Sequence, residues 1–284
     1  MTSSPPVRRF DWANLAIRAA SATVLIPAVL GAIWYGGGPF LLMIAIAIGL
    51  LAVEWGKMSA PEAPAEVAVT ITVAVLAAVF AAQIGWYRSA WALVVAGALL
   101  AAFITRHKAE RAADAAYGVI YIAPACIALV WLRNPSGEDF TWAMSAGVGW
   151  MLLLFCVTWA ADICAFAVGS LFKGPKLWPR LSPNKTWSGF VGGLVGAILV
   201  AMAFAFLTRM DLAWYAAAIV GFLGGLATMA GDLWESALKR RFGVKDSGDL
   251  IPGHGGLLDR VDGLLFATIV VAGARLIDHW GWVP

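Results

Sequence analysis

Charged residues and glycines are concentrated in residues 236–262, near the C-terminus, between two long apolar runs. The segment contains the acids Asp246, Asp249, Asp259 and Asp262, the cations Lys239, Arg240, Arg241, Lys245 and Arg260, and the histidine His254. Oxygen ligands without clustered thiols or several histidines favour a hard cation, most often Mg²⁺. Because Mg²⁺ beside lysine and arginine is typical of sites that stabilise phosphoryl-type transition states, these residue types predict a metal- and phosphate-binding site.

Helix spacing brings several of these side chains together. Asp232, Glu235 and Lys239 are spaced i, i+3 and i+7, so they share one face of a helix as it leaves an apolar run. Asp259 and Asp262 are spaced i, i+3 near the start of the next helix, where the helix dipole tolerates negative charge. We therefore expect the two helices to present carboxylates to the connection between them.

A glycine-rich run, Pro252-Gly253-His254-Gly255-Gly256, lies in this connection. Glycines let a backbone turn sharply and bring its amides close to phosphate oxygens, so Gly255 and Gly256 are candidates for binding a substrate phosphate. Two roles are open for His254: that of an acid or base, and that of a hydrogen-bonding residue within the turn. The second role is favoured.

One further carboxylate, Asp162, lies in the middle of the apolar run 158–169. A charged side chain in hydrocarbon costs several kcal/mol, so Asp162 is expected to face a polar cavity or a cation. The alternative is a carboxylate that pairs with a neighbouring helix for structure alone.

The segment 173–189 holds a second group of polar residues, in the sequence Ser-Pro-Asn-Lys-Thr. Its candidate phosphate-binding residues are Ser182, Asn184, Lys185 and Thr186. They lie at the mouth of the next predicted helix, where backbone amides and the helix dipole favour an anion. Membrane topology alone explains Lys173, Lys176 and Arg180 in the same loop equally well.

The composition indicates that these residues belong to a membrane protein. The chain has 284 residues, of which 61% are hydrophobic and 13% charged, and its mean hydropathy is +0.81. A soluble domain would carry roughly a quarter charged residues. We predict an all-α, polytopic protein with nine spans: 19–35, 39–54, 67–84, 91–105, 116–132, 146–169, 187–208, 213–233 and 257–279. The spans 39–54 and 91–105 are short, so they are tilted, extended into their flanks or partly re-entrant.

The distribution of lysine and arginine predicts the orientation. With the N-terminus in the cytoplasm, sixteen of the 20 Lys and Arg residues fall on the inner side. The four outer ones are Arg88, Arg133, Arg209 and Arg275. The C-terminus is then outside, the polar segments face the cytoplasm, and the first span is a signal-anchor without a cleavage site.

The chain divides by charge into two parts of one integrated membrane domain. Residues 1–140 are expected to form a transmembrane scaffold, with a possible dimer surface, and residues 141–284 the catalytic region. Glu54 is the conspicuous acid of the first part, and a structural helix-end role and a functional role are equally open for it. Three cysteines inside the spans favour packing over disulfide or zinc chemistry. The net charge of +3 is slight, and we expect no nucleic-acid partner.

The polar segments match a known family. The run 236–262 resembles the C-terminal motif of the phosphatidate cytidylyltransferases, also called CDP-diacylglycerol synthases. The segments 162–169, 182–189 and 231–236 also resemble that family, so the likeness covers about residues 158–263. The sequence departs from the family pattern at Ser170, Asn184 and Ser188, which leaves the aspartates and Lys185 unaffected.

The resemblance implies transfer of a cytidylyl group from CTP to phosphatidate, with release of pyrophosphate, by a homodimer. It places the protein in a bacterial inner (plasma) membrane with the active site facing the cytoplasm. It also implies a Mg²⁺ site, with a monovalent cation such as K⁺ beside it. The implied metal ligands are Asp232 and Asp259, then Asp246 and Asp262.

The resemblance also implies roles for the other polar residues. Cations that neutralise the triphosphate or the leaving group would be Lys239, Arg240, Lys245 and Arg260, and the remaining catalytic candidates are Asp246 and His254. The substrate-binding candidates are Ser182, Asn184, Lys185, Thr186, Gly255, Gly256 and Asp162.

Two other functions compete with this interpretation. A CTP-using lipid kinase needs the same cations and metal, but it transfers the γ-phosphoryl group. A secondary transporter would use Asp162 and Asp232 as coupling-ion ligands. A transporter of that kind predicts inverted repeats and broken helices, and the sequence shows no such symmetry.

Overall fold

The computed structural model describes residues 12–106, 112–133, 145–251 and 253–279, and this part of the chain forms nine α-helices and two short β-strands. The helices are α1 (Trp12–Tyr35), α2 (Gly37–Ser59), α3 (Pro64–Gln83), α4 (Tyr87–Thr105), α5 (Ala112–Arg133), α6 (Ala146–Phe172), α7 (Trp187–Thr208), α8 (Trp214–Arg241) and α9 (Leu258–His279). The strands are β1 (Lys176–Trp178) and β2 (Ser182–Thr186). Among these residues seven helices, α2 to α8, are long and apolar enough to cross a membrane.

An all-α, polytopic membrane architecture is thus what the chain adopts. Each helix overlaps one predicted span. The count of nine spans remains a prediction, because α1 offers only the shorter apolar stretch Ala19–Tyr35 and α9 is not apolar enough in composition to count as a membrane span. The two short predicted spans are continuous helices that extend into their flanks, as α2 and α4. Helix α8 continues eight residues beyond the predicted end at 233 and carries Glu235 and Lys239 with it.

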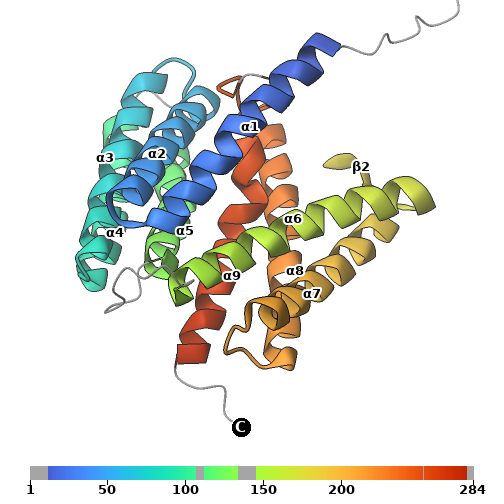
Figure 1. The fold of residues 1–284 in the computed structure, drawn as a ribbon. Helices are drawn as coiled ribbons and strands as arrows, with labels where there is room; N and C mark the ends of the chain where they lie inside the picture. Colours follow the sequence, from blue (N-terminus) through green and yellow to red (C-terminus); the bar gives the residue numbers. More distant parts are fainter. Residues whose placement is uncertain (1–11, 107–111, 134–144, 252, 280–284) are drawn as a thin grey trace, which may run out of the picture.

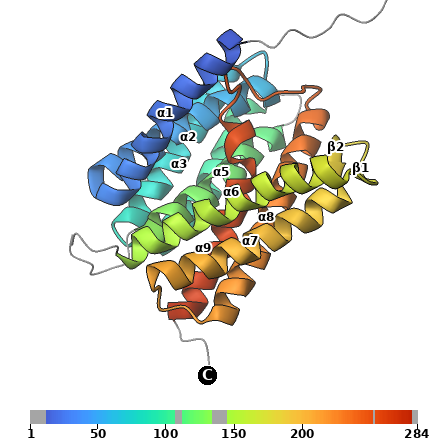
Figure 2. The ribbon, with the colours of Figure 1, turned by 45° about the vertical axis from the view of Figure 1, so that its right-hand side comes forward.

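The helices form two groups joined by α8 and α9. Helices α2 to α5 pack against one another, and α1 lies against α2 and α6. Helices α6 and α7 lie side by side and project away from α2 to α5, with the β1–β2 hairpin at their far end (Figures 1 and 2). Helix α9 contacts α5, α6 and α8. The helices that carry most of the predicted carboxylates therefore lie where the two parts of the chain meet.

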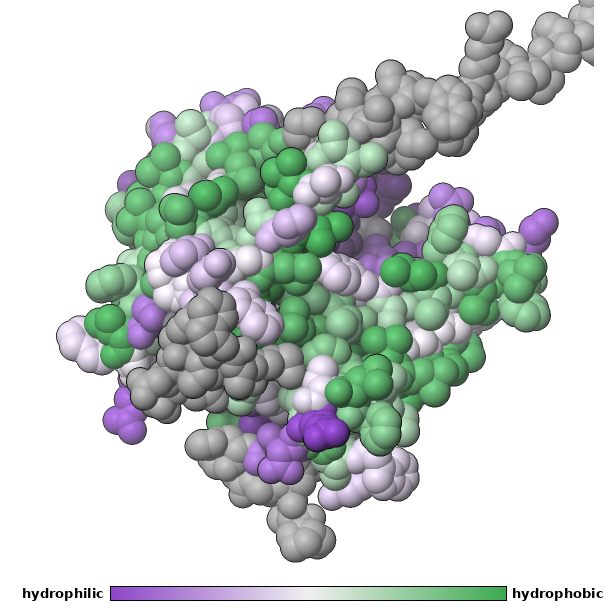
Figure 3. Space-filling model, viewed as in Figure 1, coloured by the Kyte–Doolittle hydropathy of each residue, from purple (hydrophilic) through white to green (hydrophobic). Residues whose placement is uncertain are grey.

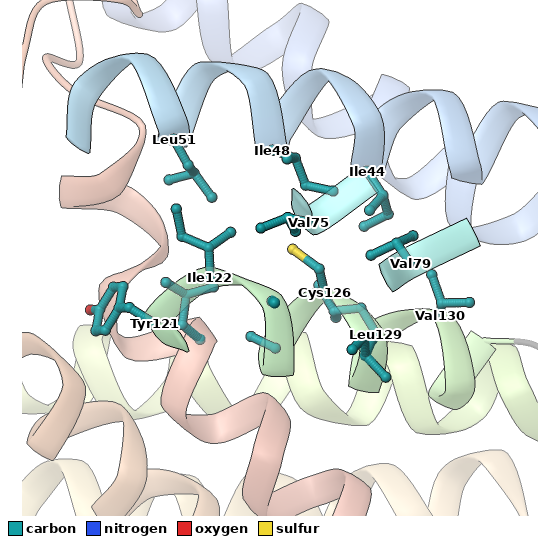
Figure 4. Close-up of a cluster of buried hydrophobic side chains, with 14 of the residues drawn as sticks. Ile44, Ile48, Leu51, Val75, Val79, Tyr121, Ile122, Cys126, Leu129 and Val130 are labelled. Carbon is teal, nitrogen blue, oxygen red and sulfur yellow. The ribbon is translucent and has the colours of Figure 1, made fainter. Parts of the chain in front are cut away.

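Apolar side chains of α2, α3 and α5 form the core of the N-terminal part. Figure 4 shows Ile44, Ile48 and Leu51 of α2 facing Ile122 and Cys126 of α5, and all five are buried. The three cysteines are free, and Cys126 packs as a small apolar side chain, as the sequence predicts.

Large apolar side chains also cover the outside of the helices. Phe166, Phe206 and Leu207 are 78%, 83% and 77% exposed. Figure 3 shows hydrophobic residues over much of the visible face, and hydrophilic residues between α1 and the β1–β2 hairpin. Such a surface is unfavourable in water and suits hydrocarbon, which supports the membrane assignment.

Contacts between distant segments place the ends of several helices on one side of the protein. Arg241 at the end of α8 forms an ion pair with Asp114 at the start of α5. The indole Nε1 of Trp55, near the end of α2, donates to the carbonyl oxygen of Asp114 over 2.9 Å. The ends of α2 and α8 and the start of α5 therefore meet on one side.

The other end of α5 lies on the opposite side. Arg133 donates to the carbonyl oxygen of Trp34, at the end of α1, over 2.9 Å, and Arg275 of α9 donates to the carbonyl oxygen of Leu132. This arrangement agrees with the alternation that the cations predict. Which side faces the cytoplasm stays a prediction, and four inner cations lie outside the described residues: Arg8, Arg9, Lys108 and Arg111.

Small residues let α7 and α8 pack closely. A Cβ added at Gly221 of α8 would lie 2.7 Å from the carbonyl oxygen of Ala197 and 2.8 Å from the Cβ of Ala201, both on α7. Membrane helices commonly approach through such small residues. Gly273 of α9 differs, because no atom lies within 4 Å of a Cβ added there.

We predict that Gly221→Ala destabilises the protein by about 1–3 kcal/mol, because the added methyl meets backbone that cannot move without separating the helices. Thermal unfolding of the purified protein in detergent measures this as a lower Tm. Gly273→Ala is the matched control and should leave the Tm unchanged or slightly raised. Equal Tm values for both variants would contradict the proposed packing constraint.

Candidate active site

Lys185 and Asp232 form an ion pair within a set of charged side chains drawn from four elements. Lys185 lies on β2, Asp232 on α8, Asp162 on α6 and Asp262 on α9. Asp162 and Asp262 each interact electrostatically with both members of the ion pair. We call these four residues the Lys185 group. Since the side chains of Lys185 and Asp232 are 26% and 36% exposed, a solute can reach them.

Close packing of α8 and α9 brings Asp232 and Asp262 into this group. A Cβ at Gly231 would lie 2.5 Å from the carbonyl oxygen of Asp262, and one at Gly263 would lie 2.9 Å from that of Thr228. The backbone N–H of Gly263 donates to the Asp262 carboxylate over 2.8 Å. Only glycine permits this approach, which explains why each aspartate has a glycine as its neighbour.

A Mg²⁺ site at the Lys185 group stays a prediction, but the residues present suit that ion. Three carboxylates interact with one lysine, which leaves an excess of negative charge and only oxygen donors. Among the described residues no three His, Cys, Asp or Glu side chains converge into a ready metal cage. Because Mg²⁺ is usually held by one or two carboxylates together with water and substrate phosphates, Asp232 and Asp262 fit that ion without such a cage.

A second set of charged residues surrounds Lys239, near the end of α8. Its Nζ lies 2.6 Å from Oε2 of Glu235 and 2.9 Å from Oδ1 of Asp259. The backbone N–H of Ser247 donates to both oxygens of Asp259, over 3.3 Å each. We call these four residues the Lys239 group. Asp259 thus lies in a different group from Asp232 and Asp262, and its predicted role as a metal ligand stays a prediction.

The glycine-rich turn is held by hydrogen bonds to its backbone and to His254. Nδ1 of His254 lies 2.9 Å from the hydroxyl of Ser21 on α1, and the carbonyl oxygen of His254 accepts from Nε of Arg260 over 2.9 Å. Gly255 has a φ of +81°, and its N–H donates to the carbonyl oxygen of Ile251. These contacts support the hydrogen-bonding role of His254.

Gly256 leaves no room for a side chain. A Cβ there would collide with the hydroxyl of Ser247 and lie 3.1 Å from Oε1 of Glu54. Sterics therefore require glycine at this position, whereas binding of a substrate phosphate by Gly255 and Gly256 stays a prediction. Pro252 of the same run lies outside the described residues.

The segment after α6 folds into a hairpin that the sequence did not predict. Strands β1 and β2 are antiparallel, with Lys176 opposite Thr186. Thr186 then caps α7, because its hydroxyl accepts the N–H of Gly189 over 3.1 Å. This contact gives Thr186 a structural role as a helix cap. Ser182 and Asn184 lie on β2 beside Lys185, and their contact with a substrate stays a prediction.

The other predicted cations lie at the surface. Arg240, Lys245 and Arg260 are exposed, and so is the acid Asp246; neither Lys245 nor Asp246 forms an ion pair within the part of the chain that the structure describes. The three cations are accessible to an anionic solute, but none of the four residues belongs to the Lys185 group or the Lys239 group.

Two residues beyond the predicted site prove to be connected with it. Glu54 is fully buried, with 0% of its surface exposed, and it contacts the segment between α8 and α9. In the sequence, the position of this acid in an apolar run was the feature that pointed to a special role. Ser247 was not singled out, because an isolated serine in a polar segment is indistinguishable from an ordinary loop residue.

Comparison with known proteins relates nearly the whole chain to one family. The chain matches the model of the cytidylyltransferase family over residues 16–276. It is 36% identical over 276 residues to a phosphatidate cytidylyltransferase of Brucella suis, covering 91% of this chain and 92% of that protein. A phosphatidate cytidylyltransferase of Staphylococcus saprophyticus is 39% identical over 153 residues, which cover 54% of this chain and 56% of that protein. One of Rickettsia conorii is 41% identical over 129 residues, which cover 43% of this chain and 56% of that protein.

The family match extends over nearly all of the chain and includes every residue of the Lys185 and Lys239 groups. The Brucella suis relative is matched over nearly its whole length as well. The N-terminal helices, in which the sequence showed only a multispan pattern, are thereby included in the similarity. The chain belongs to the cytidylyltransferase family.

Proposed function

We propose that this protein is a phosphatidate cytidylyltransferase, which converts CTP and phosphatidate into CDP-diacylglycerol and pyrophosphate. The observation that carries the proposal is the Lys185 group, in which residues of four separate elements combine a lysine with carboxylates beside apolar helices. The names of the relatives support the choice of substrates.

Charge is the main obstacle to this reaction, since both substrates are anions. An oxygen of the phosphatidate phosphate attacks the α-phosphorus of CTP in line. The new P–O bond forms as the bond from the α-phosphorus to the oxygen bridging to the β-phosphorus breaks, and pyrophosphate leaves with the electron pair. A preorganised cation near the reacting phosphates lowers the barrier, because it costs no reorganisation during the reaction.

Lys185 is positioned to act as this cation. Its ammonium group forms an ion pair with Asp232. A substrate phosphate would replace Asp232 as the partner of Lys185, which frees the Asp232 carboxylate. Asp232 and Asp262 would then hold Mg²⁺, which supplies further positive charge to the triphosphate when bound.

We place the reaction at the cytoplasmic face of a bacterial inner membrane. The Lys185 group lies among α6, β2, α8 and α9, next to the apolar outer surface of α6 and α7. The acyl chains of phosphatidate can stay in the bilayer while its phosphate reaches Lys185. We expect a homodimer and, beside Mg²⁺, a monovalent cation such as K⁺, as in the sequence-based prediction.

Product analysis tests the proposed function directly. Purified protein in detergent, with Mg²⁺, short-chain phosphatidate and CTP labelled at the α-phosphorus, should give labelled CDP-diacylglycerol and an equal amount of pyrophosphate. CTP labelled at the γ-phosphorus, offered with diacylglycerol or a polyprenol, tests the kinase alternative. A γ-labelled lipid would replace the proposed reaction with phosphoryl transfer, and no labelled lipid in either assay would favour transport.

Lys185→Ala should lower kcat/KM by about 100-fold or more, because the variant lacks a cation directed at the developing charge. Lys176→Ala is the matched control, since Lys176 lies on the other strand of the same hairpin and is exposed. Steady-state kinetics for CTP and phosphatidate measure both variants. Similar losses for the two would show that Lys185 contributes only general positive charge.

Removal of divalent cations tests the metal assignment. EDTA should abolish product formation, and added Mg²⁺ should restore it, because the excess carboxylates of the Lys185 group cannot themselves bind a triphosphate. The same titration on folded protein in which Asp262 is replaced, Asp262→Asn, should require a higher Mg²⁺ concentration for half-maximal activity. Full activity in EDTA would exclude the metal from the reaction.

A further inference from the structure

Glu54 is a buried acid of the N-terminal part that contacts the C-terminal motif. It lies near the end of α2, and its side chain is wholly inside the protein. Oε1 accepts the backbone N–H of Leu257 and Oε2 accepts that of Leu258, each over 2.7 Å. Oε2 also accepts the hydroxyl of Ser247 over 3.2 Å. Both carboxylate oxygens are therefore bonded to the connection between α8 and α9.

These contacts place a negative group at the N-terminus of α9. The first amides of a helix have no partner within the helix, and the helix dipole makes this end positive. The carboxylate satisfies two such amides, so backbone donors balance a charge for which burial would otherwise be costly. Because Glu54 takes the amides of Leu257 and Leu258, they are not available to a substrate phosphate.

The motif is shaped to admit this side chain. A Cβ at Gly248 would lie 3.3 Å from Cγ of Glu54, and a Cβ at Gly256 would lie 3.1 Å from its Oε1. Larger residues at either position would press against the carboxylate. Gly256, which suggests phosphate binding from sequence alone, and Gly248 thus make room for a glutamate of another helix.

Glu54 is connected to both charged groups through the residues that it holds. Ser247 links Glu54 to Asp259, because its hydroxyl donates to Glu54 and its N–H donates to Asp259. Asp259 in turn contacts Lys239. Leu258 is the first residue of α9, so its position also determines where Asp262 lies, one helical turn further on.

We propose that Glu54 is a positioning residue for the reaction: it fixes the start of α9 and Ser247, and thereby sets where Asp259 and Asp262 stand relative to Lys239 and Lys185. The proposal rests on the proposed function for its kinetic consequences. Glu54 itself is buried, and among the described residues it hydrogen-bonds to Ser247, Leu257 and Leu258 but to none of the charged side chains of either group. Its effect on catalysis is therefore indirect.

Glu54→Gln tests the proposal with little change in volume. The amide retains one acceptor oxygen, but its NH₂ group faces a backbone N–H, so one of the two bonds to the start of α9 is lost. We expect kcat to fall about 10–100-fold, as is typical when a residue that orients metal ligands is replaced, and a higher Mg²⁺ requirement. The apparent KM for CTP at saturating Mg²⁺ should change less than kcat.

Two controls separate positioning from general stability. Glu62→Gln makes the same chemical change at an exposed site and should match the wild type in kinetics. Gly221→Ala lowers the Tm without altering α9, so below its unfolding temperature it should keep the wild-type Mg²⁺ requirement. If Glu54→Gln does not fold, Ser247→Ala removes the hydroxyl bond to Glu54 alone and should show the same changes to a smaller extent.

Hydrogen exchange gives a readout that does not depend on the reaction. The amides of residues 247–251 and 253–259 should exchange faster in Glu54→Gln than in Glu62→Gln, while those of the other described helices exchange alike in both variants. Wild-type kinetics together with unchanged exchange would overturn the positioning role, and so would an activity loss that follows the Tm alone. If the wild type forms no CDP-diacylglycerol, the proposed function fails, and the exchange data still decide whether Glu54 holds α9.

Discussion

The start of α9, which carries two aspartates of the C-terminal motif, is held by one buried carboxylate of an N-terminal helix. Glu54 of α2 accepts the amide of Leu258, the first residue of α9, the amide of Leu257 just before it, and the hydroxyl of Ser247, and through these bonds an N-terminal helix supports the C-terminal motif. A carboxylate without those donors would be costly at 0% exposure. Helix α2 and the start of α9 must therefore form their contact together, and the positions of Asp259 and Asp262 follow from it.

The charged residues of the site obey the same constraint in a different way. In a protein whose helices are apolar enough for a bilayer, an ionised side chain that is withdrawn from water needs a partner. Lys185 pairs with Asp232, and Lys239 with Glu235 and Asp259. Both groups have more carboxylates than cations, but the excess is larger in the Lys185 group, with three carboxylates to one lysine, than in the Lys239 group, with two to one. The larger excess makes the Lys185 group the better place for a metal ion and for anionic substrates.

Glycine has two separate functions in this arrangement. Gly231 and Gly263 permit α8 and α9 to cross closely, so that their aspartates reach the same group. Gly248 and Gly256 leave space for Glu54 and Ser247. The glycine-rich run therefore resembles a phosphate-binding loop in composition, although the described contacts of Gly256 are steric and those of Gly255 lie within the turn.

The sequence by itself determined the class of the protein, the approximate helices and most of the charged residues of the site, because apolar run length and helix spacing are local properties. The residues of the Lys185 group could be named from the sequence, but not the fact that Asp259 belongs to another group. The i, i+3 spacing of Asp259 and Asp262 does not show which neighbour each carboxylate contacts. The β1–β2 hairpin and the cap at Thr186 also required the tertiary structure. The role of Glu54 was decided only there, because its partners lie some 200 residues away and hydrogen bonds of such separation leave no local pattern in a single sequence.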